Sequence, residues 1–370
     1  MESNWVVLQF LYKGTEIGLG DCTITGISYN IYPMAGAERL NQHEDPIYPG
    51  GEYLEDGRLP LQKLYEAQEV FVKKGWKKEL IYFQKETIEE KRICAPVFGY
   101  VSPYALAHPG EDSLWKKDGD HGEEPGGPNA NAREAQYLSE MGLTIPMVVL
   151  SMLNPVGYYF DWRYFGEKRS WRSFTASSVG DCGHVVARVN NQGEMCKPEL
   201  TRPANKYAGK LVEWMLVKSQ CHPPSLFIDF HEDELKEALG IKAPSRESYI
   251  YVNGRNEEVC QTIGMDIIRI LERCNFPLML NGRTRFGENV INGIVRPESD
   301  GSTQALSVAQ KYYDWKTNQW IDKPAAQVSI VIETPRDEAF PLEDRIAAYV
   351  EIIHNLPKYW QIVSGGNSHP

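Results

Sequence analysis

The sequence predicts an α/β protein with a single mixed, mostly parallel twisted sheet and helices on both of its faces. Mostly apolar runs that fit short buried strands occur at 145–153, 225–230 and 328–332. Helical patterns alternate with these runs, at 124–141, 203–217, 257–274 and 342–356. Because helices that alternate with short apolar strands are typical of a sheet covered on both faces, an α/β fold follows.

The individual elements follow from local patterns, taken in chain order. An amphipathic helix is expected over 59–76, and the apolar, aromatic stretch 94–107 suggests a strand pair. The helix over 124–141 ends at Gly142, and the apolar run after it is bounded by Asn154-Pro155. The segment between Leu114 and Asp120 contains Lys116, Lys117 and Asp118, and this charge makes it a poor strand.

The length of 370 residues allows one large domain or two ordinary ones. Neither an internal repeat nor a low-complexity linker divides the chain. We therefore expect one large domain over 77–360, an N-terminal extension of unknown role over 1–76, and a tail over 361–370.

Composition excludes several classes of function. With 39 Lys and Arg against 50 Asp and Glu, the net charge is −11, which disfavours nucleic acid and anionic membranes as partners. The seven cysteines form no CxxC pair, so a thiolate zinc knuckle is excluded and free thiols in a reducing compartment are expected. No run reaches the ~20 apolar residues of a membrane span, and the start of the chain lacks the layout of a secretory signal. We expect a cytoplasmic protein.

Polar clusters carry the residues suited to chemistry, and two of the three follow predicted buried strands, where ligand sites collect in α/β sheets. His121 and Glu124 stand three apart at a helix start, and His231 follows the strand at 225–230. Two histidines and a glutamate would leave a fourth position open, which is the arrangement of a catalytic zinc site. Glu333 ends the last buried strand and could serve as general base.

At this point the sequence resembles the zinc carboxypeptidases of the M14 type, over about residues 85 to 355. The resemblance rests on the HxxE of His121, on the distant His231, and on the strand that ends Glu333-Thr334-Pro335. The run from His121 to Pro128 also resembles the opening of bacterial murein peptide amidases. Asn154-Pro155-Val156-Gly157 resembles the Asn-Pro-Asp-Gly turn of the family. Aspartoacylases and succinylglutamate desuccinylases share this layout.

The resemblance implies a bound Zn²⁺ held by His121, Glu124 and His231, with Glu333 as catalytic base. A second HxxE, His108 to Glu111, follows a better apolar stretch and stays open as the alternative ligand pair. The Asn-Arg pair with which the family holds a terminal carboxylate is not evident. The candidates for that role, and for stabilising the oxyanion, are Arg163, Arg169 and Arg172, with Arg283 and Arg285 further along the chain.

The function predicted from the sequence is zinc-dependent hydrolysis of an amide bond in a small peptide, by a metallocarboxypeptidase or peptide amidase. The alternative within the same superfamily is an N-acyl amino acid deacylase. A catalytically silent binding protein with this fold is the alternative of another class. Neither the exact substrate nor the oligomeric state follows from the sequence.

Overall fold

The structure is a computed structural model of the chain. It describes residues 10–12, 15–17, 46, 56–88, 91–163, 187, 189–190, 194–196, 206–234, 247–284, 287–296, 303–336 and 339–365.

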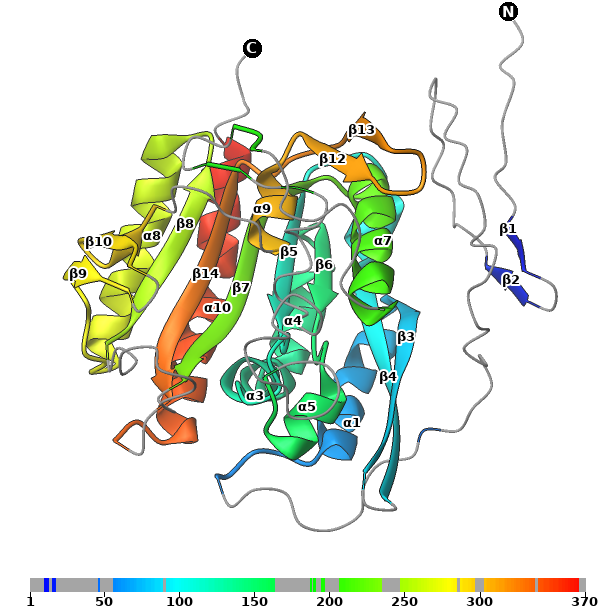
Figure 1. The fold of residues 1–370 in the computed structure, drawn as a ribbon, viewed down its shortest axis with the longest axis horizontal. Coiled ribbons are helices and arrows are strands. Elements are labelled where there is room, and N and C mark those ends of the chain that lie inside the picture. The colour runs from blue at the N-terminus through cyan, green and yellow to red at the C-terminus, as the bar shows by residue number, and fades with distance from the viewer. Residues whose placement is uncertain are drawn as a thin grey trace, which may run out of the picture.

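A ten-stranded sheet runs through the described residues (Figure 1). Its strand order is β3-β4-β6-β5-β7-β14-β8-β11-β10-β9. The strands are β3 (Lys77–Ile88), β4 (Lys91–Val101), β5 (Ser113–Asp118), β6 (Met147–Leu150), β7 (Pro224–Glu234), β8 (Tyr249–Gly254), β9 (Asn281–Arg283), β10 (Asn289–Ile291), β11 (Ile294–Val295) and β14 (Val328–Arg336). The central neighbours β6, β5, β7 and β14 are parallel, whereas most outer pairs are antiparallel. The predicted mixed sheet is confirmed, with its parallel strands gathered at the centre.

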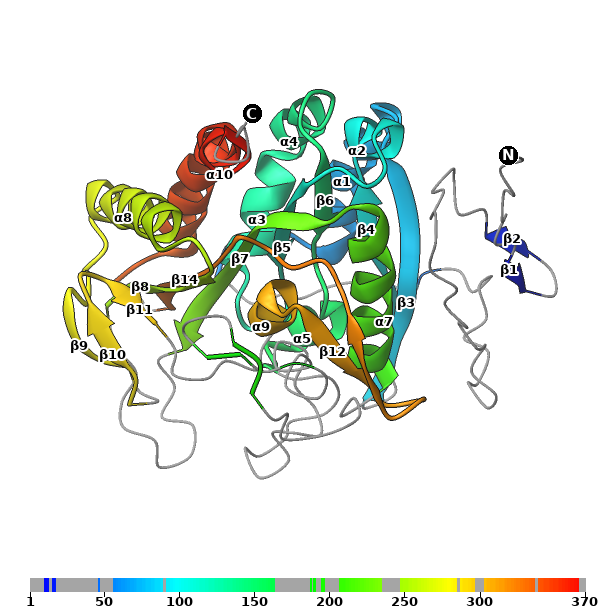
Figure 2. The ribbon, with the colours of Figure 1, turned by 90° about the horizontal axis from the view of Figure 1, so that it is seen from above.

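Helices cover both faces of this sheet, as Figure 2 shows. One face carries α1 (Leu61–Lys73), α3 (Gly126–Arg133), α4 (Ala135–Met141), α8 (Glu257–Arg273) and α10 (Leu342–Gly365). The other carries α7 (Lys206–Cys221) and α9 (Thr303–Val308). A hydrophobic core lies on each face of the sheet. Because β7 is buried on both sides, its successive side chains enter different cores: Ile228 packs on the face covered by α8 and α10, and Phe227 on the face covered by α7 and α9. The central strands are therefore held rigidly between two apolar layers.

Smaller elements complete the described chain. They are α2 (Pro103–Ala107), α5 (Pro155–Phe160), the hairpin of β1 (Phe10–Tyr12) and β2 (Thr15–Ile17), and the hairpin of β12 (Lys311–Asp314) and β13 (Gln319–Asp322).

Two element predictions need correction. The expected strand pair over 94–107 is one strand, β4, followed by the short helix α2. This helix starts there because Pro103 follows Ser102, whose hydroxyl accepts a hydrogen bond from the Ala105 amide at 3.2 Å. The helix expected over 124–141 is two helices, α3 and α4, which meet at Glu134.

The charged segment that the sequence makes a poor strand is in fact β5, in the middle of the sheet. Lys116, Lys117 and Asp118 are fully buried in it. Burial of these charges is tolerated because each lysine has a carboxylate partner. Lys116 pairs with Asp118, and Lys117 pairs with Asp120 and Asp229.

Two composition-based expectations can be compared with the described residues. Cys94, Cys196, Cys221, Cys260 and Cys274 are free thiols. Within the described part of the chain, every helix is too short or too polar to cross a bilayer.

Candidate metal centre

The site lies near the carboxyl ends of the parallel central strands β5, β7 and β14. His121 follows β5 after a short turn, His231 lies on β7, and Glu333 lies on β14. Glu333 and His231 are direct register partners, so their side chains share a face of the sheet. β7 and β14 each run four residues further than the sequence predicts, to Glu234 and Arg336, because the two strands continue to pair with each other.

His121, Glu124 and His231 form one compact group. Their potential ligand atoms all lie within 4.8 Å of one another. Nδ1 of His231 is 3.0 Å from Oε2 of Glu124, and the two imidazole rings are 5.1 Å apart, centre to centre. All three residues are buried. Two imidazoles and a carboxylate are suitable donors for a divalent transition metal, so the donor set fits the ion that the resemblance implies.

Local packing fixes the turn from His121 to Glu124. The Gly122 amide donates a hydrogen bond to the Trp162 carbonyl at 3.0 Å. A Cβ at Gly122 would lie 1.9 Å from the Gly157 carbonyl carbon, so only glycine fits against this neighbour. Asn154 caps α5 by accepting a hydrogen bond from the Gly157 amide at 3.0 Å. The Asn154-Pro155 turn therefore supports the HxxE segment directly.

The two histidines are in opposite electrostatic environments. Burial lowers the pKa of His121 well below its usual value, and the nearby Arg163 and His231 lower it further. Burial also acts to lower the pKa of His231, but the carboxylates of Asp229 and Glu124 outweigh it and raise that pKa well above the usual value. His121 is thus neutral as a metal ligand must be, whereas His231 carries a proton that a metal ion would displace.

Glu333 is a half-buried carboxyl group in an acidic environment. Burial raises its pKa to about 8, helped by Glu124 and Asp233 and opposed by His231 and Arg163. A cation held by the neighbouring ligand group would favour the carboxylate form of Glu333. A carboxylate in this position has the proton affinity and the neighbours suited to a general base.

Arg163 reaches the same site from the chain segment after α5. Its Nη1 donates to Oε1 of Glu123 at 3.1 Å and to Oε1 of Glu124 at 3.0 Å. The Arg163 side chain keeps 25% of its surface exposed, so it lies between the ligand group and solvent. It is therefore positioned at the site but is already engaged by two carboxylates.

The other candidates lie elsewhere. His108 and Glu111 precede β5, whereas His121 and Glu124 follow it, so the six residues of the strand separate the two HxxE segments. The structure therefore does not bring this alternative pair to His231. Arg283 is exposed on β9 at the far edge of the sheet. Arg169, Arg172 and Arg285 lie outside the described residues.

Sequence reasoning missed the charged residues behind the ligand group. Asp120, Asp229 and His231 form a second set whose potential ligand atoms lie within 4.8 Å of one another. Asp229 is register partner of Lys117, and its Oδ2 lies 3.2 Å from Nε2 of His231. Burial acts to raise the pKa of Asp229, but Lys117 and His231 lower it to about 2. The available signal was its position two residues before His231, on the same face of β7.

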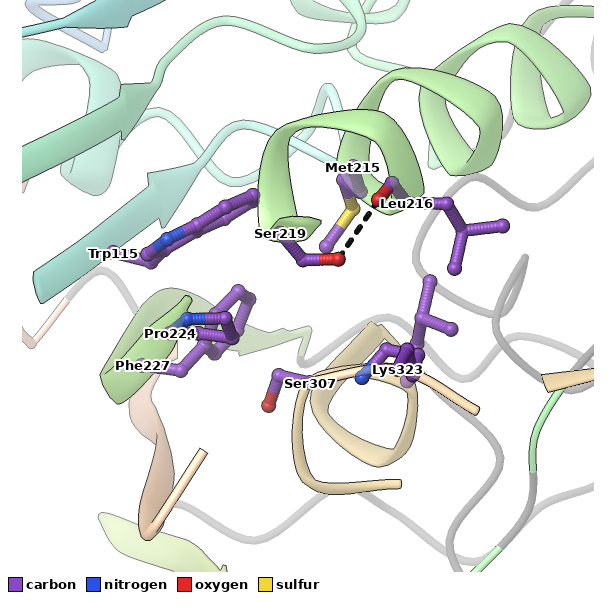
Figure 3. Close-up of a pocket in the computed structure, with 9 residues that line it drawn as sticks. Trp115, Met215, Leu216, Ser219, Pro224, Phe227, Ser307 and Lys323 are labelled. Atoms are coloured by element: carbon purple, nitrogen blue, oxygen red, sulfur yellow. Dashed lines mark hydrogen bonds between the residues drawn. The ribbon is translucent and has the colours of Figure 1, made fainter. Parts of the chain in front are cut away.

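A separate cavity lies toward the opposite end of β5 and β7, between these strands, α7 and α9 (Figure 3). Trp115, Phe227 and Ser307 line it, together with Lys323. Ser219, also in its wall, donates a hydrogen bond to the Leu216 carbonyl at 2.9 Å. Its volume is about 10 Å³, which is room for a single water molecule. It is too small to be a substrate pocket.

Comparison with known proteins places the fold. No protein-family model matches the sequence, and no curated protein matches it. The chain is similar in structure to a candidate metallopeptidase of Shewanella amazonensis, with 17% identity and a TM-score of 0.55, over 82% of this chain and 93% of that one. A candidate metallopeptidase of Shewanella baltica matches at 20% identity and a TM-score of 0.52, over 80% and 90% of the two chains.

A third candidate metallopeptidase, from Shewanella denitrificans, matches at 16% identity and a TM-score of 0.50, over 79% of this chain and 87% of that one. The three likenesses show that this chain has the fold of these metallopeptidase candidates. At such low identity they show the fold alone, and the chemistry must be argued from the site.

Proposed function

We propose that the protein is a zinc-dependent hydrolase of an amide bond, acting as a metallocarboxypeptidase or peptide amidase on small peptides. The observation that carries the proposal is the convergence of His121, Glu124 and His231 within 4.8 Å, with Glu333 beside His231 on the neighbouring strand. Two histidines and one glutamate leave a coordination position open, which separates a catalytic site from a structural one.

His121, Glu124 and His231 would hold the ion. When bound, Zn²⁺ supplies a Lewis acid that polarises a carbonyl and makes water more acidic. Glu333 takes the proton from the attacking water as general base and then gives it to the departing amine as general acid. Burial of the site strengthens these interactions because little water competes with them.

Arg163 is the candidate for stabilising negative charge on the substrate. Its guanidinium can bind a carboxylate or a developing oxyanion through two N–H groups. Its hydrogen bonds to Glu123 and Glu124 orient the guanidinium toward the ligand group. Because 25% of the side-chain surface is exposed, a substrate can reach it. If Arg169 and Arg172 contribute as well, they extend this recognition to a substrate carboxylate.

A second candidate function is an N-acyl amino acid deacylase with the same centre. Arg163 is engaged by two carboxylates, and a peptide terminus and an N-acyl amino acid both carry a carboxylate, so this residue serves either substrate class. A silent binding protein would need no base at this position, so the raised pKa of Glu333 among other acids argues for chemistry.

The test begins with the zinc content of the purified protein. We expect about one zinc ion per chain, lost in His231→Ala and retained in His354→Ala, a matched control on the partly exposed His354 of α10. Hydrolysis is then measured on free peptides, amidated peptides and N-acyl amino acids, and the best substrate decides between the two candidates. Full zinc occupancy in His231→Ala, or no hydrolysis of any substrate by the zinc-loaded protein, would contradict the proposal.

A further inference from the structure

His231 lies between two groups of carboxylates, one on each side of its ring. Nδ1 faces Glu124 at 3.0 Å. Nε2 faces Asp229 at 3.2 Å and Asp120 at 3.6 Å. The ring therefore separates the proposed zinc ligands from a second acidic set that also has the composition of a metal site.

The second set holds an ammonium group. The Lys117 side chain is fully buried, and its Nζ donates to Oδ2 of Asp120 and, at 2.5 Å, to Oδ2 of Asp229. The Asp229 oxygen that binds Lys117 is the one that faces His231. The lysine thus supplies positive charge where these carboxylates would otherwise gather a cation.

The second set also keeps unused binding capacity. Oδ1 of Asp120 and Oδ1 of Asp229 are buried without a hydrogen-bond partner among the described residues. Buried carboxylate oxygens without partners are costly, and a divalent ion would satisfy them. Once Nε2 of His231 has given up its proton to solvent, so that the ring can bridge two ions as an imidazolate, the set offers oxygen and nitrogen donors of the kind that zinc accepts.

We propose that Lys117 is a positioning residue of the metal centre, whose ammonium takes the place of a second metal ion. It neutralises Asp120 and Asp229, and it holds the Asp229 oxygen against Nε2 of His231, which leaves Nδ1 for the ligand group. The centre therefore binds one metal ion where its side chains could bind two. This inference rests on the proposed metal centre. It assigns to Lys117 the control of how many metal ions that centre binds.

The chain provides a matched control in the preceding residue. Lys116 is equally buried and also pairs with an aspartate, Asp118. It points to the opposite face of β5, where its Nζ lies 4.7 Å from the Phe230 ring centre. Loss of either lysine leaves a buried carboxylate unpaired, so both changes destabilise the fold, but only Lys117 contacts the residues behind His231.

The experiment counts metal ions on folded protein titrated with zinc and measured after desalting. We expect one zinc ion per chain for the wild type and for Lys116→Met, and two for Lys117→Met. In the double variant Lys117→Met/Asp229→Asn the count should return to one, because the second set has lost a carboxylate. Lys117→Met that folds and still binds as many ions as the wild type would overturn the inference.

If Lys117→Met does not fold without metal, Lys117→Gln is measured, since it keeps a hydrogen-bond donor for one carboxylate. Both variants should then refold when zinc is added, because the second ion replaces the ammonium. Failure of both to refold at any zinc concentration would also overturn the inference. A wild type without zinc would instead count against the proposed function, and a gain of one ion by Lys117→Met over the wild type would still support the role of Lys117.

Discussion

Glu333 is the residue whose chemistry can be separated most cleanly from its structure. In Glu333→Gln the side chain keeps its shape and loses its basicity, so hydrolysis should fall by ~10²–10⁴-fold while zinc content stays at the wild-type value. Steady-state rates and metal analysis on the same preparation test this. Glu343→Gln, on an exposed glutamate of α10, is the control and should leave both unchanged. Loss of zinc in Glu333→Gln would make Glu333 a ligand instead.

His231 couples metal binding to pH. Since the carboxylates of Asp229 and Glu124 overcome burial and raise its pKa well above the usual value, the metal-free protein carries a proton on His231 at pH 7. A metal ligand must be neutral, so zinc uptake should release this proton, and zinc affinity should rise with pH until the pKa of His231 is passed. Calorimetry in buffers of different ionisation enthalpy measures the release. Binding heats that are equal in all buffers at pH 7 would contradict it.

Lys323 gives stability a different dependence on pH. Burial, with a smaller effect of Arg255, lowers its pKa to about 7, although its Nζ still donates to the carbonyls of Ala309 and Pro324. Above pH 7 the folded state loses this proton while the unfolded chain keeps it up to about pH 10.5. Folding therefore becomes more favourable as pH rises through this window, by about 1.4 kcal/mol per pH unit for this group.

Comparison of variants isolates that effect. The free energy of unfolding of the wild type, relative to Lys323→Met, should rise between pH 7 and pH 9.5 and be flat below pH 6. The half-exposed Lys311 provides the control, since Lys311→Met should differ from the wild type by a constant amount. Parallel pH profiles for Lys323→Met and the wild type would show that Lys323 titrates normally.

At the residue scale, the sequence could predict the residues that stand at strand ends. His231 and Glu333 are readable because polar side chains directly after apolar runs are unusual, whereas His121 and Glu124 are readable from their spacing at a helix start. Lys117, Asp120 and Asp229 could not be assigned a role, because their meaning depends on the register between β5 and β7. The register between two strands depends on how the whole sheet packs, and the sequence of either strand alone does not determine it.

At the scale of elements, the turn between β5 and α3 is the part that tolerates least change. Because an added Cβ at Gly122 would overlap the backbone of α5, Gly122→Ala should displace His121 and lower zinc affinity by at least ~10-fold, the loss typical of a disturbed ligand shell. A competition titration with a chromophoric chelator measures this. Gly282→Ala, where the nearest atom is 3.5 Å away, should bind zinc normally. Equal affinities for the two variants would contradict the packing argument.

The prediction for β5 failed because hydrophobicity was the only criterion applied to it. A strand buried on both faces is usually apolar, yet this one carries two lysines and an aspartate. Lys116 pairs with Asp118 of the same strand, and Lys117 pairs with Asp120 and with Asp229 of β7, so ion pairs explain why these charges can be buried. The flanking strands β9, β10 and β11, of two or three residues each, were missed because such lengths carry no periodicity.

At the scale of the whole molecule, the centre of the fold was predictable and its edges were not. The buried strands at 145–153, 225–230 and 328–332 correspond to β6, β7 and β14, with β5 between the first two. Long apolar runs and amphipathic helices determine this core because they must be buried. The pairings on either side, antiparallel for β3 with β4 and for β8 with β14, depend on contacts that no local pattern encodes.

The position of β14 has a consequence for synthesis on the ribosome. β14 is the last strand of the described sheet in chain order, yet it lies between β7 and β8 and joins the two halves. A nascent chain that ends before residue 328 therefore has both of these edges open, lacks Glu333, and lacks Tyr349 of α10, whose hydroxyl donates to the His231 carbonyl at 2.5 Å. We expect a chain truncated after Gln327 to aggregate on expression, as a solubility assay would show; a soluble, zinc-binding truncation would contradict this. Metal loading during translation is accordingly not expected, and insertion of the ion should follow release of the finished chain.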